Sequence, residues 1–124
     1  MNGLLSNAVP TPTKLDAWVG DAALRYLLRL IVSYEYPAMS IRDMDARVEL
    51  CVRNSALGRY ANNNLIRGHF NQSPTVVEAH IHDLLLLSLQ QAMELVHDIF
   101  ATDPNRIALD KANKIVPAFQ KSKL

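Results

Sequence analysis

Apolar residues recur at three- and four-residue steps between residues 15 and 31, and this spacing constrains the fold more than any other feature. The positions are Leu15, Trp18, Val19, Ala22, Ala23, Tyr26, Leu27, Leu30 and Ile31. Such spacing is typical of an α-helix with one buried face. We expect this helix to begin near Thr13 or Lys14. It should end before Pro37, because a proline disfavours the helical conformation in the residue before it.

Start signals predict further helices downstream. Ser40 precedes Asp43 by three residues, which resembles a capping box, and we expect the helix that begins there to fray at residues 62–64, three asparagines. Ser73 and Pro74 form a second start signal. The helix after them should run to about Ala101, and its first half is apolar around most of its circumference, which predicts a central, buried helix.

The last helix should begin at Asp103-Pro104 and end before Pro117. We find no alternating strand pattern, no glycine-rich phosphate loop and no internal repeat. The sequence therefore predicts an all-α bundle of four or five helices. We divide the chain into an extended arm (1–13), a single helical domain (14–116) and a loose C-terminal tail (117–124).

The composition argues against several classes of protein, among them membrane-spanning and disulfide-bonded ones. The chain has 124 residues, of which 49% are hydrophobic, and no apolar run approaches the length of a membrane helix. The single Cys51 excludes an internal disulfide and is interpreted as a small core residue. The N-terminus lacks a secretory signal, so we expect a cytoplasmic protein without a membrane partner, with an organelle as the alternative.

The formal net charge is only +1 at pH 7, but the arginines are unevenly distributed. Seven of the eight lie in the segment from Arg25 to Arg67. They form either ordinary solvated helix faces or, after folding, a stripe that contacts phosphate.

Two acidic residues are candidates for chemistry. Asp21 follows Gly20 inside the first helix, where a glycine costs about 1 kcal/mol relative to alanine and is best explained by the close approach of another backbone. Glu78 lies near the start of the predicted buried helix, and His82 shares its face. Both acids also have structural interpretations: Asp21 as a solvent-facing residue and Glu78 as a partner of the helix dipole. Magnesium commonly takes one or two protein carboxylates, so the pair would suffice if the bundle brings them together.

Three motifs resemble the ribonuclease III catalytic domain. The run from Leu15 to Leu24 is similar to the family's signature helix, Leu-Glu-x-Leu-Gly-Asp-Ala-x-Leu. Residues 52–57 resemble its Val-x-Asn-x-x-Leu stretch, and residues 74–79 its third motif, Asp-x-x-Glu-Ala. Two of the family's four carboxylates align with Asp21 and Glu78. The other two align with Ala17 and Thr75, as in the Mini-III branch, which lacks a double-stranded RNA-binding domain.

The resemblance implies a magnesium-dependent endoribonuclease, with Mn²⁺ as a substitute ion, that cleaves double-stranded or structured RNA as a homodimer. Asp21 and Glu78 would be the catalytic metal ligands, supported by Thr75. His82, which stands where the family has a glycine, is a further supporting candidate because it shares the face of Glu78. Arg67 and Arg25 would contact phosphate, and Trp18 and Gly20 would pack at the dimer interface. Mini-III enzymes suggest ribosomal RNA processing as the role.

Two alternatives remain open at this point. Degenerate ribonuclease III domains serve as structural or RNA-binding proteins, for instance in ribosomes, and the two carboxylates would then be incidental. A helical dimerisation module without RNA is the third interpretation.

Overall fold

A computed structural model of the chain describes residues 14–64 and 74–121. These residues form seven helices and no strand, which confirms the all-α prediction. The helices are α1 (Lys14–Glu35), α2 (Ile41–Val52), α3 (Asn54–Asn64), α4 (Pro74–Leu87), α5 (Leu89–Thr102), α6 (Pro104–Ala112) and α7 (Ala118–Lys121). Within the described ranges, no helix combines the length and the apolar character needed to cross a membrane.

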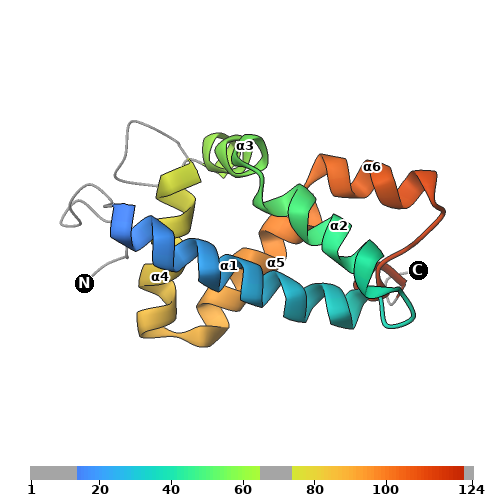
Figure 1. Cartoon of the computed structure of the whole chain (residues 1–124), viewed down its shortest axis with the longest axis horizontal. Helices are drawn as coiled ribbons and strands as arrows, with labels where there is room; N and C mark the ends of the chain where they lie inside the picture. The colour runs from blue at the N-terminus through green and yellow to red at the C-terminus, as the bar shows by residue number, and fades with distance from the viewer. Residues whose placement is uncertain (1–13, 65–73, 122–124) are drawn as a thin grey trace.

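The longest helix, α1, organises the bundle. It runs along the length of the molecule (Figure 1) and contacts α2, α4, α5 and α7. Its inward face carries Gly20, Leu24, Leu27, Leu28, Ile31 and Val32. Burial of such a stripe is the main stabilising contribution to a bundle of short helices. The sequence predicted the start of α1 correctly, and its end at Glu35 agrees with the position of Pro37.

Two helices predicted as continuous are each split in the structure. The segment after Ser40 breaks at Arg53, whose ψ of 144° is extended, and this separates α2 from α3. The segment after Pro74 breaks at Ser88, where φ is −161° and the hydroxyl accepts a hydrogen bond from the Gln91 amide. Serine favours such caps because its side chain satisfies a free backbone N–H. The break at Ser88 lets both α4 and α5 contact α1.

The prediction of a central, buried helix after Pro74 is also wrong in part. Val76, Val77 and Ile81 are buried, but Leu86, Leu87 and Leu89 at the corner between α4 and α5 are exposed. The chain turns there, so these leucines lie beyond the reach of the core. Two capping predictions are confirmed: the Ser40 hydroxyl accepts from the Asp43 amide at 3.2 Å, and Asp103 caps α6.

Part of the segment predicted to be a loose tail forms α7. The Phe119 ring meets the His97 ring edge to face, with 5.2 Å between centroids, and its amide donates to the Glu35 carboxylate at 2.8 Å. An aromatic side chain that finds a partly buried site of this kind holds a short terminal helix in place.

A buried ionic cluster joins α2 and α6 beside the end of α1. Asp110 accepts from Arg47 Nε at 3.1 Å, from Arg106 at 2.9 Å and from the Tyr36 hydroxyl. Arg106 is only 1% exposed and also donates to the carbonyl of Phe100 at 3.1 Å. Each charge here is paired, as burial requires.

The core prediction for Cys51 is confirmed, since the residue is fully buried. Burial raises the pKa of the thiol to about 12, so Cys51 stays protonated and packs as a small apolar residue.

Candidate functional site

At Gly20 the backbones of α1 and α4 come into close contact. A Cβ atom at this position would lie 1.8 Å from the carbonyl oxygen of Glu78. Only glycine lets the backbone of α4 come this near. The approach of another backbone, which the mid-helix glycine predicted, is therefore confirmed.

This contact brings the two candidate carboxylates together. Asp21 follows Gly20 on α1, and Glu78 supplies the α4 backbone that Gly20 meets. Burial, then a hydrogen bond with Asp21 and the negative charge of Asp21, raises the pKa of Glu78 to about 7, while the charge of Arg25 opposes the shift. When Glu78 is protonated, its carboxyl group can donate a hydrogen bond to the Asp21 carboxylate. The pair then shares one proton and carries a single negative charge.

Arg25 places a positive charge beside this pair. Its Nε lies 3.4 Å from Asp21 Oδ2, one turn away on α1. Its Nη1 lies 2.7 Å from Glu49 Oε1 on α2. The guanidinium therefore binds two carboxylates of its own chain, whereas the sequence suggested a phosphate contact. Glu49 belongs to no motif, and only the packing of α2 against α1 reveals its part in this group.

His82 and Thr75 occupy different surroundings, although both were expected to support Glu78. His82 Nδ1 lies 3.6 Å from Asp83 Oδ1 and 3.9 Å from Asp16 Oδ1, so its ionic neighbours are other carboxylates. Thr75 is half-buried in the first turn of α4. It precedes Glu78 by three residues and therefore shares its face.

The two residues expected at a dimer interface behave differently. Gly20 is buried against α4 of its own chain, so its role is packing within the subunit. Trp18 is 75% exposed. It belongs to an outward stripe of α1 that consists of Leu15, Trp18, Val19, Ala22 and Tyr26. Arg67, the other expected phosphate contact, lies outside the described residues.

The donor chemistry of the pair fits one divalent cation. Asp21 and Glu78 supply carboxylate oxygens from two helices, the ligand type that magnesium prefers. In residues 14–64 and 74–121, no group of three or more His, Cys, Asp or Glu side chains could hold a metal ion. A cation at the pair would therefore take most of its ligands from water and substrate, as magnesium commonly does.

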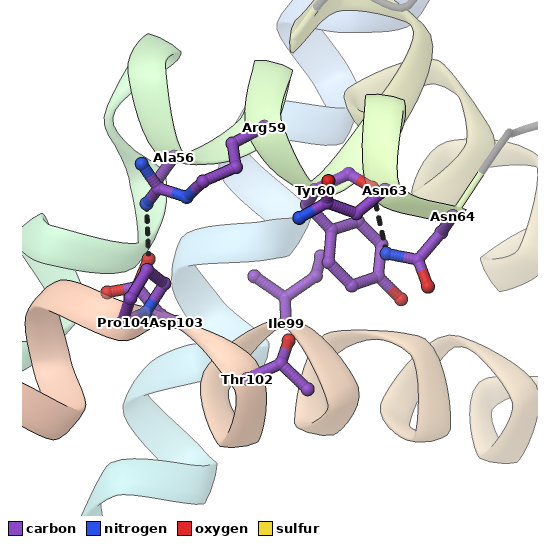
Figure 2. A pocket seen from close by; sticks show the side chains of 9 residues that line it. All are labelled: Ala56, Arg59, Tyr60, Asn63, Asn64, Ile99, Thr102, Asp103 and Pro104. Atoms are coloured by element: carbon purple, nitrogen blue, oxygen red, sulfur yellow. Dashed lines mark hydrogen bonds and ion pairs between the residues drawn. The ribbon is translucent and has the colours of Figure 1, made fainter.

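A separate pocket of about 250 Å³ lies where α3, the end of α5 and the start of α6 meet (Figure 2). Its polar groups bind one another: the Arg59 guanidinium pairs with the Asp103 carboxylate at 3.3 Å, and the Asn64 side-chain amide donates to the backbone carbonyl of Tyr60 at 2.8 Å. Tyr60 in turn donates to Asp98 at 2.6 Å. None of the residues predicted for the site lines this pocket. The bonds between its lining residues indicate a structural role, which is to join α3 to α5 and α6.

The chain matches no protein-family model, no curated protein and no solved structure at a significant level.

Proposed function

We propose that this protein is a magnesium-dependent endoribonuclease that cleaves double-stranded or structured RNA, as its resemblance to the Mini-III branch of ribonuclease III implies. The observation that carries the proposal is the contact between Asp21 and Glu78 across the α1–α4 crossing at Gly20. These are the two motif carboxylates. They are 57 positions apart in the sequence, and they lie beside each other where α1 crosses α4 at Gly20.

Three residues of the site have defined roles in this proposal. Asp21 and Glu78 would hold Mg²⁺ or Mn²⁺, and the bound ion would supply an activated water and charge neutralisation at phosphate. Thr75, on the same face of α4 as Glu78, would hydrogen-bond a water in the site. Cleavage in this class leaves 5′-phosphate and 3′-hydroxyl ends, and the resemblance suggests ribosomal RNA as a substrate.

The exposed stripe of α1 supports a homodimer. Its members recur at positions i, i+3, i+4, i+7 and i+11, which places them on one face of the helix. Contiguous exposed apolar surface of this kind marks an interaction site. A two-fold contact through this stripe is self-complementary, and it would present two carboxylate pairs to one RNA duplex.

A cleavage assay tests the proposed activity. The wild-type protein should cut a long double-stranded RNA in the presence of Mg²⁺, and Asp21→Asn should reduce the rate at least a hundredfold because a carboxylate ligand is lost. Asp45→Asn removes an exposed acid from α2 and should leave the rate unchanged. Absence of cleavage by the wild type with both Mg²⁺ and Mn²⁺, at high protein concentration, would overturn the proposal.

The second candidate is a degenerate domain with a structural or RNA-binding role, as in a ribosome. One observation favours it: Arg25 already provides Asp21 with a positive partner, as a filled structural site would. The same RNA in a gel-shift experiment separates the two functions. Binding without cleavage under either metal would support the degenerate role.

A further inference from the structure

Arg25 has the geometry of a counter-ion for the carboxylate pair. Its guanidinium spans from Asp21 on α1 to Glu49 on α2, with distances of 3.4 and 2.7 Å. The shorter bond is to Glu49, so the guanidinium is drawn toward α2. Through Asp21, which contacts Glu78, the group links three helices.

Arg25 pairs directly with Asp21, and its charge also acts on the neighbouring Glu78. The guanidinium stays charged at all relevant pH values, because arginine does not lose its proton in proteins. A fixed positive charge at this place opposes any further cation that approaches the pair.

We propose that Arg25 is an internal cation that competes with a divalent metal ion for Asp21 and Glu78, and that Glu49 controls the competition by holding the guanidinium on the α2 side. This inference rests on the proposed function, because it concerns the same pair. It assigns the chain a built-in limit on metal affinity.

Two substitutions should change metal affinity in opposite directions. Arg25→Met removes the competing charge and keeps an unbranched apolar stem, so affinity should rise. Glu49→Gln removes a negative charge and frees the guanidinium to pair with Asp21 alone, so affinity should fall. A role of Arg25 limited to stability would not produce such a change of sign.

Direct binding of Mn²⁺, measured from the electron paramagnetic resonance signal of the free ion, tests the inference without RNA. Arg25→Met and Arg25→Gln should bind Mn²⁺ at least fivefold more tightly than the wild type, since the positive charge beside Asp21 is removed. Glu49→Gln should bind at least threefold more weakly. Arg29→Met is the matched control: it removes the same charge one turn further along α1, on an exposed side chain, and should change affinity less than twofold.

The variants also separate this inference from the proposed function. Asp21→Asn placed in the Arg25→Met background should abolish the gain, which locates the ion at the pair. Equal affinity of the wild type and both Arg25 variants, with loss on Asp21→Asn, would overturn the role of Arg25 and leave the metal site intact. If neither the wild type nor the Arg25 variants bind Mn²⁺, the inference and the metal site fail together. Because the Arg25 side chain is 37% exposed, its replacement should leave the fold intact, which circular dichroism verifies.

Discussion

At Gly20 the absence of a side chain determines how closely two helices approach. The carbonyl of Glu78 fills the space that a Cβ atom would need. This residue makes the α1–α4 crossing possible and places its neighbour Asp21 beside Glu78. The Gly-Asp motif thus has a steric explanation in this chain: the glycine allows the close contact, and the aspartate next to it is the candidate functional residue.

Gly20→Ala should lower the free energy of unfolding by about 3 kcal/mol, because the α4 backbone must move to accept the methyl group. Gly58→Ala is the matched control: the nearest atom to its Cβ would be Pro74 Cδ at 3.8 Å, an ordinary contact. Alanine should stabilise α3 there by about 0.5–1 kcal/mol. Urea unfolding measures both. Equal effects of the two substitutions would contradict this assignment.

Glu78 should make stability dependent on pH. Burial first, and Asp21 second, raise its pKa from 4.5 in the unfolded chain to about 7 in the folded protein. The folded state therefore binds more protons between these values, and its stability falls as the pH rises through this window. Allowing for solvent screening of a half-buried group, we expect a loss of about 1–2 kcal/mol between pH 5 and pH 8.

Glu78→Gln should remove most of this decline, because the amide stays neutral and can still donate to Asp21. Urea unfolding at the two pH values is the measurement. Glu94→Gln, at an exposed position of α5, should keep the wild-type decline. A stability that rises between pH 5 and pH 8, and that Glu78→Gln leaves unaltered, would contradict the assignment.

At the scale of the element, α1 has two apolar faces, one of which is buried in the core while the other is exposed. One face is the core stripe from Gly20 to Val32. The other carries Leu15, Trp18 and Tyr26, which are 65%, 75% and 63% exposed. The periodicity of the sequence showed a strongly apolar helix. It did not show which apolar residues face α4 and which face outward.

Trp18→Glu should convert a homodimer into a monomer without lowering the stability of the monomer, because the indole makes little contact within its own chain. Sedimentation equilibrium at micromolar concentration measures the association. Tyr34→Glu introduces the same charge at another exposed aromatic residue of α1, off the stripe, and should leave the dimer intact. A wild-type protein that sediments as a monomer would refute the dimer.

At the scale of the whole molecule, the buried ionic cluster fixes how α6 closes the bundle. Asp110 is 3% exposed and is shared by Arg47, Arg106 and Tyr36, which come from three segments of the chain. Loss of one buried ion partner leaves the others uncompensated in a poorly solvated place. The cluster therefore restricts the packing of α2 and α6 to one arrangement.

Asp110→Asn should lower the free energy of unfolding by about 3–5 kcal/mol, since two buried guanidinium groups lose their counter-charge. Chemical denaturation followed by circular dichroism measures the loss. Asp45→Asn makes the same chemical change at an exposed position and should cost less than about 0.5 kcal/mol. Similar losses for the two variants would show that the cluster contributes little.

The sequence by itself determined the fold class, the ends of α1, the caps at Ser40 and Asp103, and the two candidate carboxylates. These features depend on local chemistry: apolar period, proline geometry and side chains that bind nearby backbone groups. The breaks at Arg53 and Ser88 carry weaker local signals and depend on how the flanking helices pack.

Only the tertiary structure decided which residues meet. It set Gly20 against Glu78, gave Arg25 the partner Glu49, placed His82 near Asp16, and brought Phe119 onto His97. Each of these contacts joins residues from different helices or distant turns. Side-chain spacing along one helix specifies a face, whereas the neighbour of that face depends on the crossing of all the helices at once.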